Sequence, residues 1–304
     1  MDRQKVLAIV GPTGIGKTSL SVWLAKQLDG EIISCDSMQV YKKMDIGTAK
    51  VTQEEMQGIH HELIDVQNYN EPYNVKVFQE KCRTAIEDVV KRGKFPILCG
   101  GTGLYLKAAL YDYEFQEENE DIAYTTFLNS KTNEELVAML KEKDEKALEK
   151  IHPNNRKRLI RALQICHSGT SKSEQEDKQQ HIPLYDVYFL GLDVNREILH
   201  DRINKRVDIM FENGLVKEVE DLFTNPETWE YTSFQGIGYK EFKDYFLKEK
   251  SIDEVKTAIK THSRQYAKRQ YTWFKNQMPV HWFEAQNRDE IYKAVKEWLD
   301  DEDK

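Results

Sequence analysis

Short apolar runs alternate with stretches of helical periodicity through the first 110 residues. Val6–Val10 is an apolar run that ends at a glycine, and Ser19–Leu28 follows it with apolar residues at helical spacing. Further strands are predicted over 31–34, 62–66, 95–99 and 186–192, and a helix over 75–92. Strands that alternate with helices predict an α/β fold, in which helices flank a parallel sheet.

The pattern changes after residue 112. Residues 113–150 are charged and helix-favouring and contain no strand signal, which predicts a helical lobe inserted into the α/β core. The core would then comprise 1–112 and 151–304. Within it we expect a basic helix over 154–166, a polar loop over 168–180, and a mostly helical remainder.

A phosphate-binding motif follows the first predicted strand: Gly11-Pro12-Thr13-Gly14-Ile15-Gly16-Lys17-Thr18. It fits the P-loop pattern G-x-x-x-x-G-K-[ST], and a strand before it with a helix after it is the expected context. The glycines let successive backbone N–H groups turn inward, where the positive end of the helix dipole also lies. Lys17 offers a charge to an outer phosphate, and the Thr18 hydroxyl offers a ligand for Mg²⁺. The motif predicts a site for a diphosphate or nucleotide.

The acid that follows the second predicted strand is Asp36. ATP-hydrolysing P-loop proteins usually carry a magnesium-binding Asp after a further buried strand, but here 95–99 runs into Gly-Gly-Thr-Gly at 100–103. Asp36 is therefore the strand-end acid near the motif, and we expect it to face a second substrate across the phosphates. The alternative is that Asp36 only caps the turn that follows it.

Charge and composition indicate which kinds of partner the protein could bind. The net charge is −8, but 256–275 contains six basic residues and no acid, whereas 112–121 contains six acids and no base. The basic stripe is either a solvated helix face or a nucleic-acid contact. No apolar run is long enough to span a membrane, and the four cysteines have no metal-binding spacing. We expect a monomeric cytoplasmic protein.

Seven blocks then resemble one family of prenyltransferases, the tRNA dimethylallyltransferases or tRNA isopentenyltransferases, in their shorter bacterial form. The blocks are GPTGIGKT at 11–18, DSMQVYKKMDIGTAK at 36–50, ELIDV at 62–66, GGTGLYLKA at 100–108, HPNNRKRLIRAL at 152–163, FQGIGYKEF at 234–242 and RQYAKRQYTWF at 264–274. The resemblance implies transfer of a dimethylallyl group from dimethylallyl diphosphate to N6 of adenosine 37 in tRNA. The P-loop would then bind the leaving diphosphate, with Mg²⁺ as cofactor.

The resemblance also implies roles for individual residues. Asp36 would be the general base, with Thr13, Thr102 and Arg206 near the reacting atoms. Ser37, Met38 and Gln39 would contact a flipped adenine. The remaining tRNA contacts would include Thr102, Lys157, Arg158, Arg161, Gln235, Gly236, Gly238, Tyr239, Lys268, Arg269 and Lys275, and the inserted lobe would clamp the anticodon stem-loop.

Two departures from the family pattern limit what is carried over. His60 and His61 stand where relatives have Pro-His-His, so we expect these histidines to be structural. Residues 112–124 lack the Pro-rich loop of relatives, and no tRNA contact is assigned there. Two other functions fit the P-loop: a small-molecule kinase that uses ATP, and a nucleic-acid-stimulated NTPase.

Overall fold

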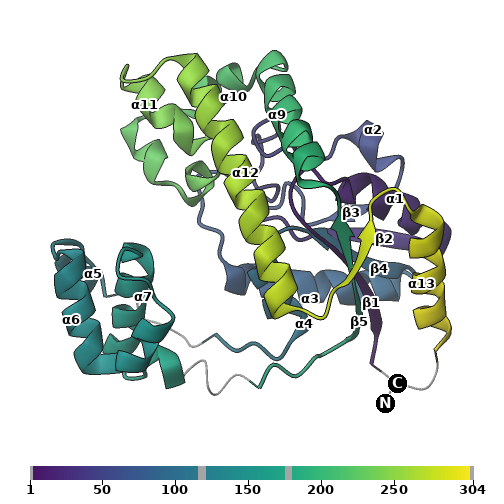
Figure 1. Ribbon diagram of the computed structural model, residues 1–304, viewed down its shortest axis with the longest axis horizontal. Coiled ribbons are helices and arrows are strands. Elements are labelled where there is room, and N and C mark those ends of the chain that lie inside the picture. The colour runs from purple at the N-terminus through teal and green to yellow at the C-terminus, as the bar shows by residue number, and fades with distance from the viewer. Residues whose placement is uncertain (1–2, 116–120, 175–179, 302–304) are drawn as a thin grey trace. The chain divides into compact units, whose positions relative to one another are not determined.

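The computed structural model describes residues 3–115, 121–174 and 180–301, and it divides into two compact units (Figure 1). The first unit combines Met1–Tyr111 with Pro183–Lys304, and the second is Asp112–Ile182. We call them the core unit and the inserted unit. The prediction ended the insertion at residue 150, whereas the structure continues it to Ile182.

The core unit is built on a parallel sheet, as predicted. Among the described residues the sheet has six strands in the order β3-β2-β4-β1-β5-β6. Their bounds are Lys5–Val10 (β1), Gly30–Ser34 (β2), His61–Glu62 (β3), Phe95–Gly100 (β4), Asp186–Asp193 (β5) and His281–Glu284 (β6). At the end of β1, Val10 pairs with Gly100 of β4 and Gly191 of β5. The loops after these strands therefore meet at one edge of the sheet.

Alternate residues of β1 supply two separate hydrophobic cores. Leu7 and Ile9 pack against α1 (Lys17–Leu28) and α13 (Arg288–Asp300) on one face of the sheet. Val6, Ala8 and Val10 belong to the larger core on the other face. Helices of that core are α3 (Val75–Lys91), α4 (Gly103–Leu110), α9 (Arg196–Glu212), α10 (Leu215–Leu222) and α12 (Ile252–Gln277). Buried strands with apolar residues on both faces are typical of parallel sheets covered by helices.

Shorter helices complete the core unit. They are α2 (Gln53–Met56), η2 (Pro226–Glu230), η3 (Thr232–Gln235), η4 (Lys240–Phe242) and α11 (Lys243–Phe246). In the described residues, no helix combines the length and the apolar character that crossing a membrane requires.

The inserted unit is a small helical bundle with its own core. It contains α5 (Ile122–Asn129), α6 (Asn133–Asp144), η1 (Glu145–Glu149) and α7 (Arg156–His167). Leu136 and Leu140 of α6 pack with Leu159 and Leu163 of α7. Arg156 also donates hydrogen bonds to three carbonyl oxygens, those of Leu128, Asn129 and Lys131. The predicted helix over 154–166 thus exists, but it belongs to this unit because its apolar face is buried against α6.

Two other predicted elements differ from the structure. The strand expected over 62–66 ends at Glu62, since Leu63 and Asp65 adopt positive φ angles of 64° and 56°. Strand β6 interrupts the stretch that was expected to be mostly helical. In the predicted loop, Ser173 donates to the Asp144 carboxylate at the end of α6. Residues 175–179 of that loop, and 116–120 of the acidic run, lie outside the described residues.

Candidate active site

The P-loop has the backbone conformation that its glycines make possible. Gly11, Gly14 and Gly16 have φ angles of 140°, 79° and 105°. Residues other than glycine rarely adopt such positive angles. Gly16 is the N-cap of α1 and has no side chain that could accept a hydrogen bond from the first turn of this helix. The N–H groups at the start of α1 and the positive end of the helix dipole give this loop the chemistry of an anion site.

The Lys17 ammonium lies over this loop. Its Nζ donates to the carbonyl oxygens of Gly11 and Pro12, both at 2.9 Å. Burial lowers the pKa of Lys17 to about 8, although the charges of Cys99 and Asp36 partly oppose the shift. The site therefore contains a lysine that can change its charge close to neutral pH.

Asp36 follows β2 at the same edge of the sheet. Its Oδ1 accepts hydrogen bonds from the backbone N–H groups of Met38, at 2.8 Å, and Gln39, at 3.3 Å. One oxygen thus caps the following turn, as the structural alternative predicted. No hydrogen bond to the other oxygen is formed by the residues that the structure describes. That oxygen keeps its capacity to accept a proton.

The Asp36 charge acts on cationic and phenolic groups at this edge of the sheet. Burial is the main cause of the lowered pKa of Lys17 and Arg206, and in both the Asp36 charge opposes the shift. Burial likewise raises the pKa of Tyr266 to about 12, and the Asp36 charge adds to this effect. Asp36 therefore lies close enough to all three groups for their charges to interact.

Arg206 of α9 connects the P-loop to the segment after β2. Its Nη1 donates to Thr13 Oγ1 at 3.2 Å, and its Nη2 donates to the Ala49 carbonyl oxygen at 3.4 Å. The sequence predicted that Thr13 and Arg206 lie near one reacting centre, and the structure places them in contact. Thr102, also predicted there, is the residue before α4 and directly follows Gly101, whose carbonyl oxygen lies at the same edge of the sheet.

The sequence pattern did not identify Gln270 of α12 as part of this site. Its Oε1 accepts a hydrogen bond from the Thr13 N–H, and its Nε2 donates to the Gly101 carbonyl oxygen, both at 2.9 Å. Only 6% of the residue is exposed. The only hint in the sequence is that Gln270 is a polar residue within the aromatic block RQYAKRQYTWF. Helical spacing alone does not show which groups its side chain contacts.

The 41–50 segment is held by polar contacts, several of them made by one little-exposed lysine side chain. Lys50, whose side chain is 6% exposed, donates to the Tyr41 carbonyl oxygen and forms ion pairs with Asp45 and Asp65. Ala49, which accepts from Arg206, also accepts from the side-chain amide of Gln39 at 3.1 Å. The Gln39 amide nitrogen, expected to contact adenine, is therefore used within the protein in this structure.

Glu218 of α10 anchors the same segment from outside. Its carboxylate accepts from the backbone N–H groups of Asp45, Ile46 and Gly47 at 2.7–2.9 Å, and from the Tyr239 hydroxyl at 2.7 Å. Four hydrogen bonds to one carboxylate fix the position of the loop.

Replacing Glu218 by Ala should therefore lower the free energy of unfolding by about 2 kcal/mol. Three N–H groups would lose a charged acceptor, and water can only partly replace it. Urea unfolding of the variant would measure this effect, with Glu220→Ala on the exposed side of the same helix as the control. Equal unfolding free energies for the two variants would show that Glu218 does not anchor the loop.

The predicted tRNA contacts fall into two groups. The first is basic and exposed: Lys157, Arg158 and Arg161 of α7 in the inserted unit, and Lys268, Arg269 and Lys275 of α12 in the core unit. The second group is the turn at 235–239, where Gln235 is exposed and Tyr239 is buried. Tyr239 is fully buried, and Gln235 Nε2 donates to the Trp229 carbonyl oxygen at 2.6 Å.

Packing within the protein explains why this turn contains two glycines. A Cβ at Gly236 would lie 2.3 Å from Met38 Cε, and one at Gly238 would lie 2.8 Å from the Gly47 carbonyl oxygen. The prediction that Tyr239 contacts tRNA is therefore corrected, because its side chain lies in the core. The turn supports the loop that follows Asp36.

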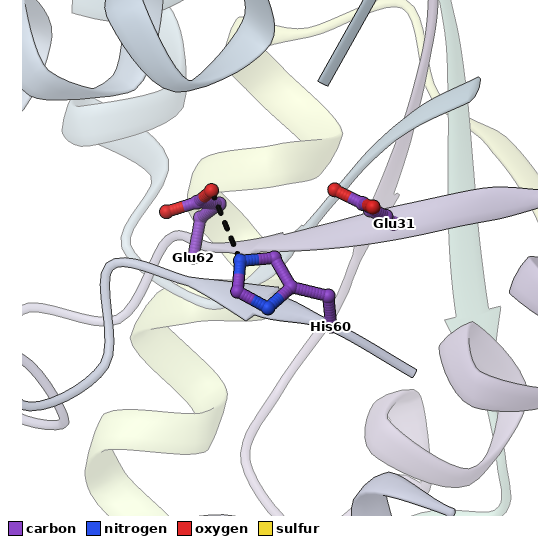
Figure 2. Close-up of side chains that lie close together, drawn as sticks. All are labelled: Glu31, His60 and Glu62. Atoms are coloured by element: carbon purple, nitrogen blue, oxygen red, sulfur yellow. Dashed lines mark hydrogen bonds and ion pairs between the residues drawn. The ribbon is translucent and has the colours of Figure 1, made fainter. Parts of the chain in front are cut away.

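A candidate metal cluster lies elsewhere in the core unit. Figure 2 shows His60 turned toward Glu62, at 3.1 Å, with Glu31 nearby. Arg92 already forms ion pairs with Glu31, at 2.6 Å, and Glu62, at 2.9 Å. Glu31 lies near the start of β2, whereas Asp36 follows its end, so this cluster is distinct from the P-loop edge. We interpret it as an ion-pair network, which agrees with the structural role expected for the histidines.

The fold and this edge define the class of the protein: an α/β protein with a P-loop-like parallel sheet and an inserted helical unit. The family model described as IPP transferase matches residues 39–277, and the chain belongs to this family. The family resemblance predicted from the sequence blocks is confirmed.

Curated relatives and solved structures agree with this assignment. The chain is 49% identical to a tRNA dimethylallyltransferase of Bacillus anthracis, over 97% of this chain and 96% of the relative. A tRNA isopentenylpyrophosphate transferase of Bacillus halodurans has a similar structure, with a TM-score of 0.75, 41% identity, and coverage of 98% of this chain and 97% of that one. A eukaryotic dimethylallyltransferase acting on tRNA gives a TM-score of 0.81 and 32% identity over 97% of this chain and 77% of its own.

Proposed function

We propose that this protein transfers the dimethylallyl group of dimethylallyl diphosphate to N6 of adenosine 37 in tRNA and releases diphosphate. The observation that carries the proposal is the position of Asp36. Asp36 follows β2 at the P-loop edge, where its charge acts on Lys17 and Arg206, and its turn uses only one of its oxygens. Relatives named tRNA dimethylallyltransferase, at 49% identity, support the same reaction.

The proposed chemistry follows from the groups at this edge. An exocyclic adenine amine is a weak nucleophile, because its lone pair is delocalised into the ring. As its nitrogen bonds to the prenyl carbon, the bond from that carbon to the diphosphate oxygen breaks, and Asp36 accepts a proton from the nitrogen. Lys17, Arg206 and the P-loop N–H groups would stabilise the negative charge that develops on the diphosphate.

The residues at the start of α1 fit a magnesium ion. Thr18 offers a partly exposed hydroxyl directly after Lys17, and Mg²⁺ usually takes a few protein oxygens together with substrate phosphates and water. We therefore propose that Thr18 holds the ion, which would supply further positive charge to the diphosphate when bound.

The exposed basic residues of α7 and α12 are the proposed tRNA contacts. Replacing Lys268 by Ala should weaken tRNA binding most at low salt and reduce the slope of log K against log salt by about 0.7–0.9. The reason is that one phosphate contact, and the counterion released with it, would be lost. Binding titrations at several salt concentrations would test this, with Lys293→Ala of α13 as a control of equal charge. An unchanged slope would remove Lys268 from the interface.

Mass spectrometry of the tRNA product tests the proposed function directly. A tRNA with adenosine at position 37 would be incubated with the protein, dimethylallyl diphosphate and Mg²⁺, and the same tRNA with guanosine at that position is the control. The expected result is a dimethylallyl mass increase confined to the nucleoside at position 37. ATP turnover without prenyl transfer would instead support a kinase or an NTPase.

A further inference from the structure

Gln270 has an unusual place in the core unit. Its side-chain amide lies between the two glycine-rich loops of the P-loop edge, and it bonds to the backbone of both. Thr102 directly follows Gly101 in the chain. One buried amide thus connects the neighbourhoods of Thr13 and Thr102.

The hydrogen bond from the Thr13 N–H to Gln270 affects the position of Lys17, because one peptide group connects the two contacts. The Thr13 N–H and the Pro12 carbonyl belong to the same planar trans peptide, so they point in opposite directions. Gln270 accepts from the N–H on one side, and Lys17 Nζ donates to the carbonyl oxygen on the other, both at 2.9 Å. Holding the N–H therefore fixes the direction of the carbonyl that receives the lysine.

The contact with Gly101 requires both halves of an amide. Nε2 must donate to the Gly101 carbonyl oxygen while Oε1 accepts from Thr13, and among side chains of this length only glutamine does both without charge. The fit is close, because a Cβ at Gly101 would lie 2.0 Å from Nε2. A glycine at 101 and a glutamine at 270 thus depend on each other.

We propose that Gln270 is a positioning residue for diphosphate binding, which orients the Pro12–Thr13 peptide and joins the P-loop to the Gly100–Gly103 loop. The proposal rests on the proposed function, since it assigns the diphosphate to this loop. Gln270 acts through the backbone of Thr13 and the position of Lys17. It does not itself touch the reacting atoms.

Calorimetric titration of inorganic diphosphate with Mg²⁺ would test the role of Gln270 apart from the reaction. In Gln270→Met, which keeps the length and loses both hydrogen bonds, we expect the Kd for diphosphate to rise about fivefold to tenfold. The KM for dimethylallyl diphosphate should rise with it, whereas the Kd for tRNA should not change. Gln270→Glu should bind diphosphate more weakly still, because it adds a negative charge beside the anion.

Two further variants keep the test decisive. Gly101→Ala should displace the same amide from the other side and give the same loss of diphosphate affinity with Gln270 intact. Gln277→Met, at an exposed position of the same helix, should behave as the unchanged protein. A Gln270→Met protein that unfolds at the unchanged midpoint and binds diphosphate normally would overturn the positioning role alone. Failure of the unchanged protein to bind diphosphate would overturn the proposed function and this role together.

Discussion

Replacing Asp36 by Asn should lower kcat for prenyl transfer by about 10²–10⁴-fold while tRNA binding persists. The structure favours Asn over Ala for this purpose. Asn keeps a side-chain oxygen that can accept from the Met38 and Gln39 N–H groups, so the turn after β2 is preserved. It removes only the basicity of the group and its negative charge.

Single-turnover transfer with saturating tRNA and donor would measure the chemical step. Asp29→Asn is a matched control, because Asp29 has a positive φ angle of 48° that Asn tolerates, and its partner Lys94 is exposed. A second comparison is Asp36→Ala, which should lose the turn cap as well and be less stable than Asp36→Asn. A near-normal transfer rate in Asp36→Asn would remove Asp36 as the general base.

The parts of this fold that the sequence predicted are those with strong local signals. The buried strands are short apolar runs, and the P-loop is a contiguous motif with a strand before it and a helix after it. The family resemblance placed Thr13 and Arg206 near the same reacting atoms, and the structure places their side chains 3.2 Å apart. The separation of 193 positions carries no signal of that contact in a single sequence.

The parts that the sequence could not supply depend on long-range polar contacts. Lys50 reads as an ordinary charged residue, yet it is buried and bonds to three groups of its own loop region. Glu218 lies on an amphipathic helix, where an acid is usually solvated. The family resemblance implied that Tyr239 contacts tRNA, but its side chain is buried, and the two glycines before it allow close packing against Met38 and Gly47. The backbone partners of Glu218 are 171–173 positions away, and even the nearer partners of Lys50 are brought together only by the folding of the loop.

The C-terminal boundary of the inserted unit was predicted wrongly for a similar reason. The charged, strand-free composition marks the insertion up to residue 150, and basic residues then suggest a surface helix of the core. The helix α7 is also amphipathic, and the sequence does not indicate which bundle its apolar face joins. Packing of Leu159 and Leu163 against α6 settles the question in the structure.

Replacing Lys17 by Ala should weaken diphosphate binding by about 10²-fold or more and abolish transfer at ordinary donor concentrations. The ammonium is the charge at the start of α1, and it already lies over the loop that would hold the anion. Thermal unfolding should change little, since the loop carbonyls of Gly11 and Pro12 can accept from water instead. Diphosphate titration of Lys17→Ala beside Lys26→Ala, an exposed lysine of the same helix, would measure the difference.

The lowered pKa of Lys17 adds a pH dependence with a definite sign. With a pKa of about 8, the lysine is charged below that pH and loses its charge above it. A bound diphosphate favours the charged form, so binding above the free pKa must take up a proton, and affinity should fall by up to about tenfold per pH unit there. Calorimetry in buffers of different ionisation enthalpy should detect this proton uptake. Lys17→Arg keeps its charge at all these pH values and should lose the alkaline decline, whereas a decline that persists in Lys17→Arg would assign it to another group.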